Sequence, residues 1–119
     1  MSMPNEALQK LMQEIEARAI FSQQQLQIVK SQMAGKHRDI RLLQLTSREL
    51  DTLPPSTKVY EGVGKMFVLE ELSDIQKRLE DEKKSSEGDI KDLEKKFRYL
   101  ETTYEKAQDN INQILNRGR

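Results

Sequence analysis

Residues 58–69 read Lys58-Val59-Tyr60-Glu61-Gly62-Val63-Gly64-Lys65-Met66-Phe67-Val68-Leu69, two runs rich in β-branched and aromatic side chains. Gly64 separates the runs and Gly62 lies close to it, where a tight turn favours residues without a side chain. Short runs of this composition around a glycine-containing turn are typical of a β-hairpin. We therefore expect a hairpin over residues 58–69, with both glycines serving the turn.

A long helix is expected on each side of the hairpin, over residues 5–53 and 73–116. Ser73 to Gln76 has the pattern of a capping box, with Ser73 as N-cap, at the start of the second helix. A similar pattern from Thr46 to Glu49 allows a break in the first helix near Thr46. The first helix keeps a heptad stripe, apolar except at two serines and one lysine: Met12, Ile15, Ala19, Ser22, Leu26, Val29, Met33, Lys36, Ile40, Leu43, Ser47 and Leu50.

The second helix carries a matching stripe. Leu72 and Leu79 keep its register, Lys83 and Ser86 interrupt it, and from residue 90 it is continuous. The continuous part comprises Ile90, Leu93, Phe97, Leu100, Tyr104, Ala107, Ile111 and Ile114. A stripe with a spacing of 3.5 residues is covered by another helix. The sequence thus predicts a mainly α fold, a long antiparallel two-helix coiled coil with a central β-hairpin.

Composition narrows the function. Of the 119 residues only 35% are apolar and 34% are charged, and Lys+Arg and Asp+Glu balance at 20 each. This balance argues against nucleic-acid or membrane partners. Cysteine is absent, His37 is the only histidine, and Gly62 and Gly64 do not form a phosphate loop. We therefore predict no enzyme activity, no catalytic residues, no metal site and no cofactor, in a soluble intracellular protein.

The hairpin implies a partner. An isolated two-stranded hairpin is marginally stable, and its outer edges expose unpaired backbone groups. The two helices are committed to each other, so we expect several hairpins to join into an oligomeric β-barrel that removes those edges. The residues predicted to make this oligomerisation surface are Val59, Tyr60, Val63, Met66, Phe67, Val68 and Leu69.

Two coiled-coil arms around a hairpin resemble a β-class prefoldin subunit. The resemblance covers essentially the whole chain, and it is most specific in Tyr60–Leu69; Tyr99-Leu100-Glu101 and Gln108-Asp109-Asn110-Ile111 are similar to the second helix of that class. It implies a hetero-hexamer with other prefoldin subunits, an ATP-independent holdase that captures unfolded actin and tubulin and delivers them to the cytosolic chaperonin. A single prefoldin-like domain over residues 1–119 follows from it.

The resemblance places client binding at the helix ends where the two termini meet. The implied client-binding residues are Met1, Met3, Ala7, Leu8, Leu11, Met12, Ile111, Ile114 and Leu115. Those on the stripe also serve in ordinary seam packing, whereas the flexible methionine thioether suits irregular apolar surfaces. Ile20, Phe21 and Ile28 point away from the partner helix and form a candidate outer patch for a client or a neighbour.

Alternatives remain open. A structural coiled-coil adaptor or dimerisation module has the same heptads, and an RNA-binding helical hairpin requires a basic stripe that the mixed charges do not supply. If the helices pair with residue numbers summing to about 124, Gly35 and Lys36 lie opposite Gly88 and Glu87. Weak stripes at one height then indicate either a soft joint or tolerated sequence variation.

Overall fold

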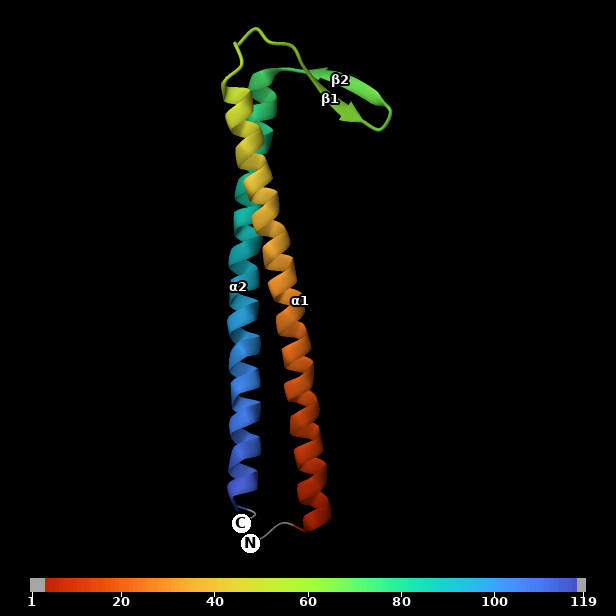
Figure 1. The fold of residues 1–119 in the computed structure, drawn as a ribbon, viewed down its shortest axis with the longest axis vertical. Helices are drawn as coiled ribbons and strands as arrows, with labels where there is room; N and C mark the ends of the chain where they lie inside the picture. Colours follow the sequence, from red (N-terminus) through yellow and green to blue (C-terminus); the bar gives the residue numbers. More distant parts are fainter. Residues whose placement is uncertain (1–3, 118–119) are drawn as a thin grey trace. The chain divides into compact units, whose positions relative to one another are not determined.

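A computed structural model describes residues 4–117. Helix α1 spans Asn5–Asp51, strand β1 Val59–Val63, strand β2 Met66–Glu70 and helix α2 Leu72–Arg117 (Figure 1). The two strands pair antiparallel in a two-stranded sheet. The mainly helical fold with a central hairpin is therefore confirmed, whereas closure of the hairpin into an oligomeric barrel stays a prediction.

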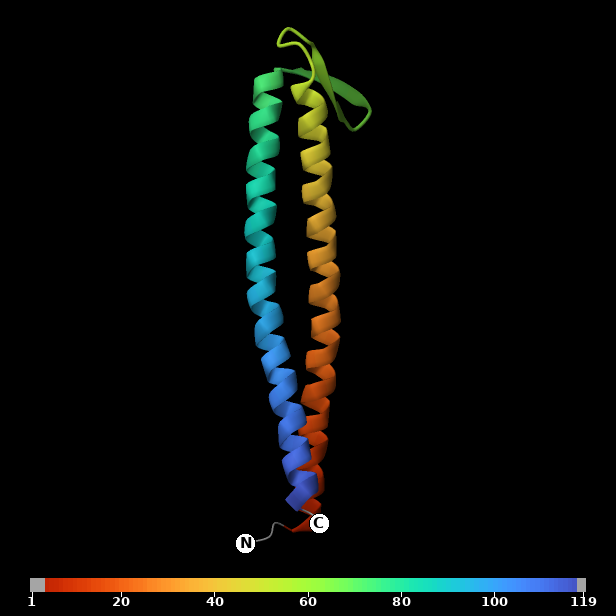
Figure 2. The same ribbon diagram turned by 60° about the vertical axis from the view of Figure 1, so that its left-hand side comes forward.

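The chain divides into two compact units. The first contains the chain up to Met33 and from Asp92 onward, and the second is Ala34–Lys91, which includes both strands. Within each unit a segment of α1 lies beside a segment of α2 running in the opposite direction, as two views show (Figures 1 and 2). A single domain over residues 1–119 stays a prediction.

The heptad stripes are the seam between the two helices. Every predicted a and d residue of α1 from Met12 to Leu50 is buried or half-buried, and the same holds for the continuous stripe of α2. Val29 is fully enclosed in the first unit, whereas Ile90 is buried in the second. Removing apolar surface from water at about 25 cal/mol per Å² is the main stabilising contribution available to such a seam. The two helices of the chain therefore cover each other's apolar stripes.

The stripe of the second unit contains a charged residue. Lys36 Nζ lies 3.0 Å from Asp89 Oδ2 on the facing helix, so its stem stays in the seam while its ammonium group reaches an acid. The hydrogen bond to Asp89, with its negative charge, raises the pKa of Lys36. The residue numbers of Lys36 and Asp89 add up to 125, close to the 124 predicted for facing residues. The facing acid is however Asp89 and not the predicted Glu87. An ion pair therefore takes the place of apolar contact at this level.

The break that the pattern near Thr46 allowed does not occur, because α1 runs unbroken to Asp51. The Thr46 hydroxyl donates to the Leu42 carbonyl at 2.9 Å, the hydrogen bond of a threonine inside a helix rather than at its start. The helix ends where Pro54-Pro55 follow. There the amides of Thr52 and Leu53 turn back to the carbonyls three residues earlier, at 3.2 and 3.1 Å.

The start of α2 also differs from the prediction. The helix begins at Leu72, and the Glu71 carbonyl accepts hydrogen bonds from the amides of Asp74 and Ile75 at 3.1 Å. Gln76 does not reach back to Ser73; its Nε2 donates to Asp51 Oδ1 at 2.9 Å, at the end of α1. A side chain expected to cap its own helix therefore joins the two helices beside the hairpin.

The turn of the hairpin needs one glycine and not two. Gly64 has φ of +61°, no other residue of the described chain has positive φ, and Val63 pairs with Met66 across a two-residue loop. These features fit a type II′ turn, which places glycine at its first central position. Gly62 instead lies inside β1 opposite Phe67, so its predicted role as a turn residue is wrong.

Candidate assembly surface and client-contact residues

The hairpin has two faces with different surroundings. Because side chains alternate along a strand, the register places Val59, Glu61, Val63, Met66, Val68 and Glu70 on one side, here called the inner face. The opposite side, the outer face, carries Tyr60, Gly62, Phe67 and Leu69. Val59, Glu61 and Glu70 are half-buried, whereas all four residues of the outer face are exposed. The chain's own structure therefore covers part of one face and leaves the other open.

The exposure of the hairpin is concentrated in large apolar side chains. Phe67 is 76% exposed and Met66 69%, the two largest values among the large apolar residues near the turn. Of the other residues predicted for oligomerisation, Val59 is half-buried. The remaining four are exposed: Tyr60, Val63, Val68 and Leu69. Contiguous exposed apolar residues of this kind are typical of a surface that binds another protein.

The backbone edges of the hairpin are open too. A type II′ turn closes with a hydrogen bond from the Met66 amide to the Val63 carbonyl, which makes these two a bonded pair. Bonded pairs alternate with non-bonded pairs along an antiparallel ladder. The amides of Tyr60, Gly62, Phe67 and Leu69 therefore point outward from the ladder. These outward amides can donate hydrogen bonds to a further strand at either edge of the hairpin.

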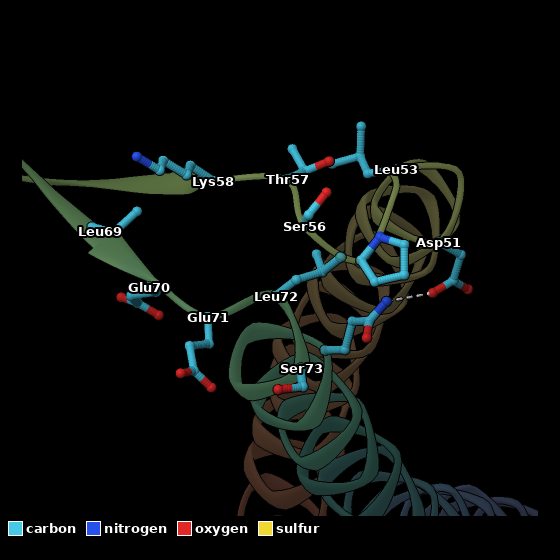
Figure 3. Close-up of a pocket in the computed structure, with 12 residues that line it drawn as sticks. Asp51, Leu53, Ser56, Thr57, Lys58, Leu69, Glu70, Glu71, Leu72 and Ser73 are labelled. Carbon is cyan, nitrogen blue, oxygen red and sulfur yellow. Dashed lines mark hydrogen bonds between the residues drawn. The ribbon is translucent and has the colours of Figure 1, made fainter.

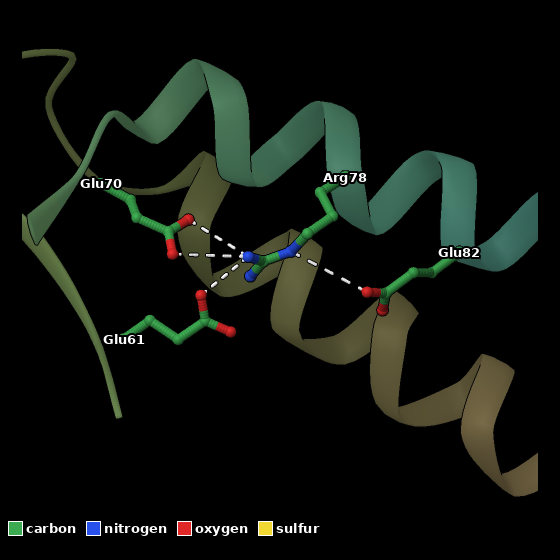
Figure 4. A network of polar contacts seen from close by, with 4 residues as sticks. All are labelled: Glu61, Glu70, Arg78 and Glu82. Atoms are coloured by element: carbon green, nitrogen blue, oxygen red, sulfur yellow. Dashed lines mark hydrogen bonds and ion pairs between the residues drawn. The ribbon is translucent and has the colours of Figure 1, made fainter. Parts of the chain in front are cut away.

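A polar cluster on the inner face connects the strands to α2 (Figure 4). Arg78 Nη1 donates to Glu61 Oε2 of β1 at 2.7 Å and lies 3.2 Å from Glu70 Oε2 of β2. Arg78 Nε is 3.9 Å from Glu82 Oε1, one helical turn further along α2. These four residues, here called the Arg78 cluster, place one cation among three carboxylates.

The pKa values of the two strand glutamates are shifted in opposite directions. A hydrogen bond between Glu61 and Glu70, followed by the hydrogen bond to Arg78, lowers the pKa of Glu61. The same hydrogen bond, with burial, raises the pKa of Glu70 despite the nearby guanidinium. Glu61 therefore carries the ionised contact with Arg78, and Glu70 is the carboxyl that takes up a proton first.

A hollow of about 770 Å³ lies at the base of the hairpin, between the end of α1 and the start of α2 (Figure 3). Leu53, Pro55, Leu69 and Leu72 supply its apolar lining, and hydroxyl, carboxyl and amide groups surround them. The hollow is open to solvent, and it lies in the same compact unit as the outer face of the hairpin. Its chemistry suits an apolar side chain with polar neighbours.

The predicted client-binding residues fall into three groups. Met1 and Met3 lie outside the described residues. Leu115 is 51% exposed in the last turns of α2. The others are half-buried in the first unit: Ala7, Leu8, Leu11, Met12, Ile111 and Ile114. The structure therefore places most of this set in or beside the seam, and their role in client binding stays a prediction.

The candidate outer patch is exposed as predicted. Ile20, Phe21 and Ile28 are 57%, 59% and 49% exposed on α1 in the first unit. Beside them a shallow groove of about 160 Å³ is lined by Ile20 and by Tyr104 of the facing helix, among others. These side chains are therefore accessible, and their role in contacting a client or a neighbour stays a prediction.

Within residues 4–117 neither helix combines the length and apolar character that crossing a membrane requires. No cluster of histidine and acidic side chains in the same range is arranged to hold a metal ion.

The comparison with known proteins identifies the family. The family model described as "Prefoldin subunit" matches residues 6–117. This chain belongs to the prefoldin subunit family. It is 37% identical to human (Homo sapiens) prefoldin subunit 1 over 108 residues, covering 91% of this chain and 88% of that protein. It is 35% identical to the probable prefoldin subunit 1 of Schizosaccharomyces pombe, covering 90% and 96% of the two chains.

A solved structure agrees on the prefoldin fold. The crystal structure of the prefoldin beta subunit from Thermococcus strain KS-1 matches with a TM-score of 0.79 at 20% identity, over 94% of each chain. Members of the prefoldin family are chaperone-type proteins that assemble with other prefoldin subunits, and the resemblance predicted from the hairpin is confirmed.

Sequence reasoning missed two residues of this prefoldin chain. Arg78 was not singled out, because its partners in the strands are 17 and 8 residues away rather than four. Ile75 is buried beside the seam, although the heptad places Gln76 there. A hydrophobic residue directly after the helix start was the available signal for Ile75. For Arg78 the available signal was Glu82, which lies four residues further along the same helix.

Proposed function

We propose that this chain is one subunit of a hetero-hexameric, ATP-independent holdase in the cytoplasm. In this proposal it captures unfolded proteins such as actin and tubulin at its helix ends and passes them to the cytosolic chaperonin. The observation that carries the proposal is the hairpin, whose large apolar side chains and outward amides are left unsatisfied by the chain itself. Membership of the prefoldin family gives the class of partner.

Assembly through the hairpin follows from its two open edges. A strand from a neighbouring subunit would pair with the outward amides of one edge, and a second neighbour would pair with the other. Repeating this contact closes the sheet into a barrel, which buries the outer face and removes the edges in one step. Tyr60, Phe67 and Leu69 then lie at the centre of each contact.

Client contact at the helix ends rests on the chemistry of the residues found there. Leu115 is exposed, and the half-buried residues Leu8, Leu11 and Met12 are close enough to solvent to become available if the first turns of α1 fray. Apolar side chains on a loosely held helix end suit unfolded chains, which expose apolar residues without a fixed shape. Ile20, Phe21 and Ile28 offer a second surface of the same chemistry.

The mass of the native complex tests the assembly. The tagged chain is isolated from its own cells without crosslinking, and intact complexes are analysed by native mass spectrometry. We expect a hetero-hexamer in which this chain is one of several different subunits. A homodimer, or a fixed pair with one coiled-coil partner, would contradict the proposal and support the structural adaptor instead.

A truncation tests client binding at the helix ends. Removing residues 1–7 and 113–119 should leave the complex assembled, with a native mass lowered only by the residues removed. Suppression of actin or tubulin aggregation should fall. The matched control replaces Phe21 and Ile28 by serine in the full-length chain. Unchanged suppression by the truncated complex, with loss in the control, would move the client-binding surface to the outer patch.

A further inference from the structure

The connection between the hairpin and α2 depends on very few contacts. Strand β2 ends at Glu70 and α2 begins at Leu72, so a single residue separates them. Within residues 4–117 every side-chain hydrogen bond between a strand and a helix is made by Arg78. Arg78 therefore supplies all of the side-chain hydrogen bonding described between the hairpin and α2, beside the short Glu71 connection.

Arg78 holds both strands at once. Its Nη1 contacts Glu61 of β1 at 2.7 Å and Glu70 of β2 at 3.2 Å, and the two acids lie on the inner face (Figure 4). Because both inner-face acids are drawn to α2, the outer face is turned away from that helix. A planar guanidinium suits this task, since it presents several donors in a fixed geometry, whereas an ammonium group is a single point of charge.

The cluster is more than an ordinary surface ion pair. The side chain of Arg78 is 40% exposed and those of Glu61 and Glu70 are 37% and 25% exposed, so any one pair alone would contribute little. However, three acidic side chains surround this cation, and two of them come from the two strands of the hairpin. Removing the cation would leave three acids facing one another and would drive the hairpin away from α2.

We propose that Arg78 is the positioning residue for assembly, which fixes the hairpin on α2 so that its outer face meets the partner subunits in a ready geometry. This inference rests on the proposed assembly through the hairpin. A surface already held in its bound orientation loses less conformational freedom on association than a swinging one. Arg78 itself does not need to touch the partner.

Two measurements test the proposal on the full-length chain. The sequence has no cysteine, so the substitutions Lys65→Cys at the turn and Lys84→Cys on α2 introduce unique spin-label sites. The distribution of distances between the labels reports the orientation of the hairpin in the free subunit. The concentration at which the native complex dissociates reports assembly.

Arg78→Ala should broaden the distance distribution and raise the dissociation concentration by roughly tenfold, with helicity retained. Lys77→Ala is the matched control, because it removes a neighbouring positive charge of the same helix and should change neither quantity. Arg78→Lys should recover little, since an ammonium group does not bridge both strands. Exchanging charges by Glu61→Arg together with Arg78→Glu should narrow the distribution again and restore part of the assembly.

The inference is overturned if Arg78→Ala gives a distribution as narrow as that of Lys77→Ala. It is equally overturned if the distribution broadens and the dissociation concentration does not change. In both cases Phe67→Asp, in an otherwise wild-type chain, decides the proposed function separately: loss of the complex in that variant keeps assembly through the hairpin, and an intact complex removes it.

Discussion

The helical seam buries its apolar side chains, whereas the hairpin exposes them to solvent. In the first unit Val29 is completely enclosed between α1 and α2, and every stripe residue around it is buried or half-buried. In the hairpin Phe67 is 76% exposed, and its neighbours on the outer face are exposed as well. The stripe residues of the helices and the strand residues of the hairpin are both mainly apolar. The difference shows that the helices cover each other's apolar side chains within the chain, and it supports our proposal that other subunits complete the sheet.

The largest effect is expected from a charge on the outer face. Phe67→Asp places a carboxylate where the assembled sheet needs an apolar side chain, and an unpaired buried carboxylate costs several kcal/mol, roughly 2 or more. We expect loss of the native complex with far-UV helicity kept. Tyr99→Asp is the control, because Tyr99 is also an exposed aromatic, at 72%, but lies on α2. An assembled Phe67→Asp complex of wild-type mass would contradict the comparison.

The converse change tests the seam. Val29→Asp puts a charge at a fully enclosed position and should lower stability by roughly 2 kcal/mol or more, seen as a clear fall in thermal midpoint. Ile28→Asp, at the adjacent and half-exposed position, should shift the midpoint little. Equal effects of the two variants would show that the seam does not carry the stability assigned to it.

The Arg78 cluster predicts a difference between its two strand acids. The pKa of Glu61 is lowered, so its stabilising effect is present above about pH 4.5 and is lost as pH falls through its folded value. The pKa of Glu70 is raised, so its contribution is fully present below about pH 4.5 and is lost as pH rises through its folded value. At pH 7 Glu61→Gln should therefore loosen the hairpin, whereas Glu70→Gln should be neutral or favourable.

Carboxyl NMR on the wild-type chain and spin-label distances in the two single variants check this assignment. The pKa of Glu61 should lie below that of Glu70 in the wild-type chain, and the distance distribution at pH 7 should broaden in Glu61→Gln alone. The reverse order of the two variants would show that Glu70, not Glu61, makes the main contact with Arg78.

The smallest effect is expected at the two helical glycines of the second unit. A Cβ on Gly35 would lie 3.8 Å from the Arg38 guanidinium, and one on Gly88 would meet nothing within 4 Å, so alanine fits at both positions. Each replacement should add up to about 1 kcal/mol of helix stability. If the soft joint exists, hydrogen exchange at residues 33–38 and 84–89 is faster than in the flanking helix and slows in the double variant. Uniform protection would leave only sequence variation.

Local rules predicted most of the fold, and their failures share a cause. Heptad spacing placed Val29 and Leu100 in the seam, and the glycine between apolar runs placed the hairpin within a residue of its bounds. The errors at Thr46 and Gln76 arose because a capping pattern does not reveal whether a side chain finds a better partner in its own helix or across the seam. Arg78 was missed for the same reason, since its partners come from the strands.

The candidate site could be predicted only in part. The apolar residues of the hairpin were recognisable by composition, and they are exposed because no helix or strand within residues 4–117 covers them. Which face is open was not predictable, because it depends on the register and on the side of the strands that Glu61 and Glu70 occupy. Burial at the helix ends depends equally on packing that a stripe does not specify.

Amide hydrogen exchange, compared between the free chain and the native complex, tests the central claim most directly. If partners complete the sheet, the outward amides of Tyr60, Gly62, Phe67 and Leu69 become strongly protected on assembly. The amides of Glu61 and Val68, already inside the ladder, should gain less, and those around Val29 should not change. Equal exchange of the four outward amides in the free and assembled states would contradict the account.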